Sequence, residues 1–161
     1  MLDKLNENPK WRSIFGKVQP DRRQRDAELI LRFFALHYES AKYEKPMKKW
    51  LTKFMAANRK PSEDKLAEYR SLFEETVAQV HATLGDKPFH IHAGLNAAVF
   101  DATFAAFAKH KGKATAKTKG LYAALLKNES FIECITAATT DEDVVKERLR
   151  IANEKLFPPA K

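Results

Sequence analysis

Apolar residues recur along this chain at the three- and four-residue spacing of amphipathic helices, and strict alternation of apolar and polar positions is scarce. The clearest case runs from Ser62, a good N-cap, to Gly85, with apolar positions at Leu66, Tyr69, Phe73, Val77, Val80 and Leu84. The chain has only five glycines in 161 residues. This pattern predicts an all-α fold, a single-domain bundle of about six to eight helices over residues 1–161.

Caps and breaks divide the rest of the chain into further helices. Asn8 and Pro9 start a short helix that Gly16 ends. The stretch "DKPFHIHAG", residues 86–94, is expected to be a connector, and Gly94 opens an alanine-rich helix. The remaining helices are expected at residues 21–41, 46–55, 119–128 and 130–139, and from Thr140, as a cap, to Leu156.

Polar residues inside the most apolar helices are candidates for a buried network. Glu28 and Arg32 stand four apart in one such helix, and Asp101 interrupts another. Removing one partner of a buried ion pair costs about 3–5 kcal/mol, so such charges need partners. We expect Arg32 or Arg25 to meet Asp101; the alternative is that Arg32 and Asp101 both reach water. The candidate network comprises Arg25, Asp26, Glu28, Arg32, Asn96 and Asp101.

The net charge of +8 favours an anionic partner, nucleic acid first. Residues 42–60 hold seven basic residues and one acid, and residues 109–119 hold five lysines and no acid. Such patches suit phosphate contact, although solvated lysine faces also keep proteins soluble. The candidate nucleic-acid-binding residues are Arg22, Arg23, Arg25, Lys48, Lys49, Lys53, Lys111, Lys113 and Lys117.

Motifs for catalysis or cofactors are missing from the sequence. No glycine-rich phosphate loop or cysteine cluster occurs, and His90 and His92 have no evident third ligand, so we expect no metal, no cofactor and no assignable catalytic residue. Enzymatic activity is left open, with a non-catalytic role favoured. The single Cys134 suits a reducing compartment, and no apolar run approaches membrane-spanning length. We therefore expect a cytoplasmic protein without a membrane partner.

Three ordered stretches resemble a known family: "LNENPKWRSIFGKVQPDRRQRDAELILRFFAL", "YEKPMKKWLTKFMAANR" and "GLNAAVFDATFAAFA". From Leu2 to Leu156 the chain is similar to the helical second half of the bacterial family that includes GmrSD-type restriction proteins and related phage-defence proteins. Full-length members carry a preceding ParB-like domain with an Asp-Gly-Gln-Gln-Arg motif linked to nucleotide hydrolysis, and some carry a following HNH-type nuclease. Neither motif occurs here, because "DRRQRD" lacks the glycine and the order.

The resemblance implies a fragment, a truncated gene product or half of a split system. The function expected from it is a non-catalytic accessory domain of a DNA-targeting restriction or phage-defence protein, with nucleic acid or a ParB-like nucleotide-hydrolysing domain as partner. The alternative is a structural or oligomerisation module without nucleic-acid contact. In that case exposed apolar strips around Trp11, Phe15 and Trp50 would dock on another domain or on a second copy.

Overall fold

The structure, a computed structural model, describes residues 1–92 and 94–159, and apart from one isolated bridge between His90 and Leu95 the regular secondary structure of these residues is helical. Ala93, within the predicted connector, lies outside the described residues. The all-α prediction is confirmed. The five-residue helix α1 was not predicted, because it is too short to show the apolar spacing of a helix. The helices are α1 (Leu2–Asn6), α2 (Pro9–Phe15), α3 (Arg25–Glu39), the 3-10 turn η1 (Ser40–Lys42), α4 (Met47–Ala57), α5 (Glu63–Leu84), α6 (Ala97–Lys109), α7 (Thr118–Leu125), α8 (Glu129–Thr136) and α9 (Glu142–Leu156).

Helix boundaries follow the expected caps where the capping chemistry is local. The Asn8 side chain accepts hydrogen bonds from the backbone N–H groups of Lys10 and Trp11, and Gly16 ends α2 in the left-handed conformation at φ 82°. Ser62 Oγ accepts a hydrogen bond from Lys65 N at 3.2 Å, and α5 ends before Gly85, as predicted.

The predicted starts of α3 and α6 are wrong by a turn or nearly a turn. Helix α3 begins at Arg25 rather than Asp21, because the Asp21 side chain accepts from Arg23 N at 2.9 Å in a turn and Gln24 is left-handed at φ 55°. Helix α6 begins at Ala97 rather than Gly94, because Asn96 Oδ1 caps it by accepting from Ala98 N and Val99 N.

The start of α9 also differs from the prediction. Asp141, not Thr140, occupies the N-cap position, and its side chain makes no capping hydrogen bond. The Thr140 carbonyl instead accepts a 2.6 Å hydrogen bond from the hydroxyl of Tyr43. This contact ties the start of α9 to the chain that follows α3.

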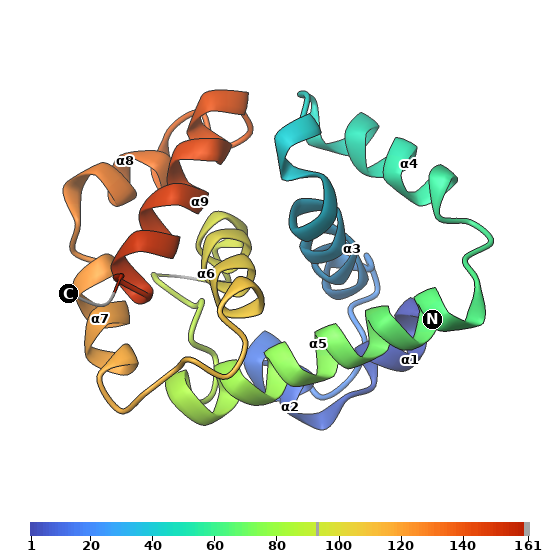
Figure 1. Cartoon of the computed structure of the whole chain (residues 1–161), viewed down its shortest axis with the longest axis horizontal. Coiled ribbons are helices and arrows are strands. Elements are labelled where there is room, and N and C mark those ends of the chain that lie inside the picture. Colours follow the sequence, from blue (N-terminus) through green and yellow to red (C-terminus); the bar gives the residue numbers. More distant parts are fainter. Residues whose placement is uncertain (93, 160–161) are drawn as a thin grey trace.

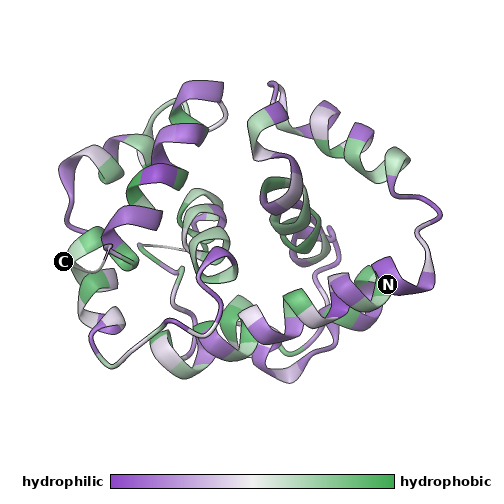
Figure 2. Cartoon of the chain, viewed as in Figure 1, coloured by the Kyte–Doolittle hydropathy of each residue, from purple (hydrophilic) through white to green (hydrophobic). Residues whose placement is uncertain are grey.

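Helices α3 and α6 lie side by side in the middle of the molecule (Figure 1). Helix α5 runs along one side of this pair, α4 flanks α3, and α7, α8 and α9 gather around α6 (Figure 1). Figure 2 shows hydrophobic residues along α3 and α6, whereas α4 and α9 mix hydrophobic and hydrophilic positions. Among the described residues, no helix is both long and apolar enough to cross a membrane.

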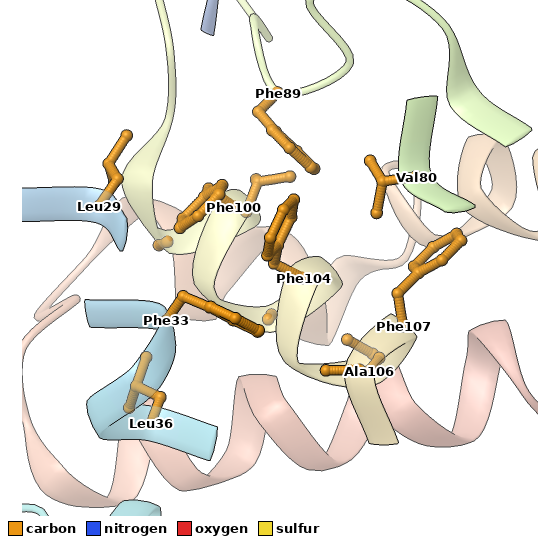
Figure 3. Close-up of a cluster of buried hydrophobic side chains, with 14 of the residues drawn as sticks. Leu29, Phe33, Leu36, Val80, Phe89, Phe100, Phe104, Ala106 and Phe107 are labelled. Carbon is orange, nitrogen blue, oxygen red and sulfur yellow. The ribbon is translucent and has the colours of Figure 1, made fainter. Parts of the chain in front are cut away.

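Aromatic rings fill the space between the two central helices and their neighbours. Phe33 of α3 meets Phe104 of α6 edge-on, with ring centroids 5.0 Å apart. Phe89, from the connector, points toward Phe100 and Phe104 (Figure 3). Trp11 of α2 reaches the same cluster, 5.7 Å from Phe100. Aromatic contacts of this kind contribute beyond their buried area, so the cluster fixes how α2, α3 and α6 pack.

The predicted exposed apolar strips are not exposed. Trp11, Phe15 and Trp50 are only 0%, 6% and 4% exposed and belong to the core. Trp11 even has its indole N–H satisfied inside the protein, by Asn6 Oδ1 at 2.9 Å. The prediction was wrong because apolar stripes on short helices look the same whether a partner domain or the protein's own core covers them.

Candidate functional site

Asp101 is the centre of a buried ion-pair cluster. Helix α6 places this carboxylate in the interior, where the residue is 1% exposed. Arg32 of α3 donates from Nε to Asp101 Oδ1 at 3.0 Å, and its Nη2 pairs with Oδ2. The contact between Arg32 and Asp101 that the sequence predicts is therefore present. Bidentate pairing of this kind fixes geometry as well as charge.

A second arginine, which sequence reasoning missed, shares the same carboxylate. Arg148 of α9 donates from Nη2 to Asp101 Oδ2 at 2.9 Å and from Nη1 to the carbonyl of Thr139. It is 0% exposed, and its Nε has no hydrogen-bond partner among the described residues. The signal for it was its spacing, three residues after Val145 and four before Ala152, on the apolar stripe of α9.

The two arginines differ in their surroundings. Burial lowers the pKa of Arg148, and the charge of Asp101 offsets this only in part. For Arg32 burial acts in the same direction, but the charge and hydrogen bonds of Asp101 outweigh it and raise the pKa. Glu28 adds a further negative charge 3.8 Å from Arg32 Nη1. Two guanidinium groups thus share one fully enclosed carboxylate, with Glu28 at the solvent edge.

A separate buried cluster joins α2 to the start of α3. Arg12, also missed from the sequence, pairs with Asp26 through a 2.7 Å contact from Nη1 to Oδ2. It also donates to the carbonyls of Lys17 and Gln19, at 2.8 and 2.6 Å. Asp26 in turn accepts from Asp21 N at 2.8 Å. This cluster holds the loop between α2 and α3 closed.

The predicted polar network is therefore divided rather than continuous. Arg25 pairs with Asp21, 3.0 Å from Nη2 to Oδ2, and not with Asp101. Asn96 caps α6 and donates to the carbonyl of Ile135 at 3.3 Å, away from Asp101. The physical reason is helix geometry: Arg25 and Arg32 lie about 10 Å apart along the axis of α3.

These clusters have the character of structural supports. Both oxygens of Asp101 are occupied by guanidinium groups, so neither is available to take a proton from a substrate. Over residues 1–92 and 94–159, no group of three or more histidine, cysteine, aspartate or glutamate side chains is arranged to hold a metal ion. His90 is partly buried, and its Nδ1 has no partner within the described chain.

The basic residues of 42–60 are partly neutralised by neighbouring acids. Lys48, Lys49 and Lys53 occupy the exposed face of α4. Lys53 lies 3.4 Å from Glu44. Two other lysines of this stretch are also paired, Lys42 with Glu39 at 3.9 Å and Lys45 with Asp141 at 3.1 Å.

The lysines of 109–119 are less compensated. Lys109, Lys111, Lys113, Lys117 and Lys119 are all exposed. Within the described part of the chain, only Lys111 forms an ion pair, with Glu75 of α5. We call this stretch the α6–α7 segment.

The predicted nucleic-acid-binding residues lie on three parts of the molecule: α4, the α6–α7 segment and the loop before α3 with the first residue of α3. Helix α4 and the α6–α7 segment lie at opposite sides of the molecule (Figure 1). Arg22 and Arg23 are exposed in the loop before α3. Helix α4 instead follows the far end of α3, about 22 Å along that helix.

Comparison with protein-family models, curated protein sequences and solved structures finds no match for this chain. The resemblance to restriction and phage-defence proteins stays an expectation from the three ordered stretches of sequence described above.

Proposed function

We propose that this chain is a non-catalytic helical accessory domain of a DNA-targeting restriction or phage-defence protein, and that it binds nucleic acid through the α6–α7 segment. One observation carries the choice of surface: five exposed lysines lie there without an acid among them, and only Lys111 is paired within the described residues. Lysines without nearby acids release counterions when they meet phosphates, which drives association with nucleic acid. The restriction or defence context is supported by the sequence resemblance.

The α6–α7 segment is also held firmly enough to act as a surface. Thr118 is buried, and its Oγ1 accepts a 2.9 Å hydrogen bond from Thr115 N, which shapes the loop before α7. Tyr122 of α7 donates to the carbonyl of Pro88 at 2.7 Å. Phosphate contacts from such lysines position a duplex without reading its sequence. The expected binding is therefore indifferent to DNA sequence.

The residues expected to form the docking surface of an assembly module are not at the surface. Trp11, Phe15 and Trp50 are buried in the protein's own core, so they are not free to contact a second copy. Of the large apolar residues that are exposed, Met1 and Met55 line one groove beside α4, and Val18 and Ile132 lie on other elements.

Fluorescence anisotropy with a labelled DNA duplex tests the proposal. The wild-type chain is expected to bind at about 50 mM salt and to weaken steeply as salt rises. A variant with Lys113→Gln, Lys117→Gln and Lys119→Gln should bind more weakly and lower the salt slope by about 0.9 for each phosphate that is no longer neutralised. The matched control carries Lys48→Gln, Lys49→Gln and Lys53→Gln on α4. No binding at low salt, or equal weakening in both variants, would refute the assignment.

A further inference from the structure

A groove of about 560 Å³ opens between α2, the first half of α3 and the segment that leads into α6. Its apolar wall includes Phe15, Leu29 and Leu95, and its charged residues are Lys17, Arg25, Glu28 and Arg32. Small-molecule sites typically occupy about 300–1,000 Å³ and combine apolar walls with a few fixed polar groups. The groove has both properties.

The charges around the groove favour an anion. Three cations, Lys17, Arg25 and Arg32, line the groove with one carboxylate, Glu28, and Asp21 behind them pairs with Lys17 and Arg25, so these groups together keep an excess of one positive charge. Asp21, which pairs with Lys17 and Arg25, has a side chain only 4% exposed, whereas those two cations are 52% and 63% exposed. His90 also lines the groove, and burial lowers its pKa, which keeps it neutral near pH 7.

Arg32 provides a fixed donor on this wall. Its Nε and Nη2 are engaged by Asp101, which anchors the guanidinium from inside the core. Its Nη1 makes no hydrogen bond to any residue that the structure describes, and its nearest carboxylate oxygen, on Glu28, is 3.8 Å away. The residue is 9% exposed. A charged donor held in place before binding loses little conformational entropy when it meets an anion.

We propose that this groove binds a phosphate monoester attached to a flat or apolar body, such as a nucleoside. A phosphate monoester carries about −1.5 to −2 charges at neutral pH and three acceptor oxygens, enough for Lys17, Arg25 and Arg32 together, whereas a carboxylate offers two oxygens and one charge. The apolar wall accommodates the body of the ligand. A free mononucleotide and the 5′-phosphorylated end of a nucleic-acid strand share this chemistry. The groove does not include the lysines of the α6–α7 segment, so this inference stands apart from the proposed function.

Isothermal titration calorimetry of the full chain with adenosine 5′-monophosphate tests the inference, with adenosine as the matched ligand that lacks the phosphate. The monophosphate is expected to bind and adenosine to bind at least about tenfold more weakly, because the charged hydrogen bonds are absent. Arg25→Gln should weaken monophosphate binding about tenfold, and Lys119→Gln, on a distant surface, should not.

Gly94→Trp provides a second variant that leaves Arg32 in place. Gly94 lines the groove, and a Cβ there would meet no atom within 4 Å, so a large side chain fits at the groove wall without displacing its neighbours. Circular dichroism confirms folding of each variant before titration. Loss of binding in this variant supports the location, and unchanged binding overturns it. Equal binding of adenosine, or no binding of the monophosphate at millimolar concentration, overturns the chemistry.

Short single strands with and without a 5′-phosphate identify the source of the monoester. Competition by the phosphorylated strand assigns the groove to a nucleic-acid end, and competition by the free nucleotide alone assigns it to a small metabolite. Either result supports a monoester site. Failure of duplex binding through the α6–α7 segment would leave these outcomes unchanged, since the duplex and nucleotide experiments probe different surfaces.

Discussion

Arg148 on α9 donates a 2.9 Å hydrogen bond to Asp101 on α6 in the protein interior, across 47 residues of sequence. Arg32 on α3 reaches the same carboxylate from the other side. One aspartate therefore joins three helices that are distant in the chain. Because both arginines are at least nine-tenths buried, the loss of this carboxylate would leave two enclosed charges without their partner.

Asp101→Ala is expected to lower the free energy of unfolding by about 3–5 kcal/mol, the usual cost of breaking a buried ion pair. Urea denaturation followed by circular dichroism measures the change. Asp64→Ala is the control, because Asp64 is an exposed carboxylate in the first turn of α5 and contributes about 0.3–1 kcal/mol through the helix dipole. Small and equal losses in the two variants would contradict the role assigned to Asp101.

Arg148→Met should cost less stability than Asp101→Ala. The methionine removes a cation whose Nε is unsatisfied among the described residues and leaves Asp101 paired with Arg32. A double-mutant cycle combining the two substitutions is expected to give a coupling energy of about 1–3 kcal/mol. Additive losses in urea denaturation would show that Arg148 and Asp101 do not interact.

Most of the fold could be predicted from local signals such as caps and apolar spacing. Features that depend on backbone conformation or on contacts between distant residues could not. The caps at Asn8 and Ser62 depend on neighbouring residues alone, and both predictions are confirmed. The start of α3 was predicted wrongly because Gln24 adopts the left-handed conformation just before the helix, and the helix propensity of glutamine does not indicate this. The start of α6 was predicted wrongly because the apolar pattern does not show that the Asn96 side chain accepts hydrogen bonds from the first N–H groups of the helix.

The candidate site shows the same division. Arg32 and Asp101 could be paired because each interrupts an otherwise apolar helix. Arg148 was missed although it lies on the apolar stripe of α9, because that helix carries many charges and the sequence does not show which of them packs against α6. Arg12 was hidden for a similar reason: its partner Asp26 lies 14 residues away, beyond an irregular loop. The division of the basic residues among three parts of the molecule depends on the path of the chain in space.

Asp26 should make stability depend on acid pH. Burial raises its pKa, but hydrogen bonds from Asp21 N, Arg12 and Ala27 N outweigh burial and leave the pKa below the usual 3.8. A carboxylate with a lowered folded-state pKa stabilises the protein above its unfolded pKa, and this contribution is lost as the pH falls through the folded value. The wild type should lose stability below about pH 4 more steeply than Asp26→Asn. Parallel urea midpoints from pH 6 to about pH 2 would contradict this.

Cys134 should react slowly with thiol reagents in the folded protein. Its side chain belongs to the core, with the residue 9% exposed, and burial raises the pKa of the thiol, which lowers the thiolate fraction. Reaction with Ellman's reagent at pH 8 is expected to be at least about tenfold slower than in urea. Because Cys134 is the sole cysteine, the absorbance signal reports this site alone. Equal rates would place the thiol at the surface.

The shared carboxylate has a consequence for how the protein opens. The last helix of a chain commonly frays independently, and its amide protons then exchange with solvent faster than those of the interior. Here α9 cannot detach without breaking the buried hydrogen bond from Arg148 to Asp101 and leaving that carboxylate to Arg32 alone. The amides around Arg148 should therefore exchange more slowly than those at the end of α9, and Arg148→Met should speed their exchange.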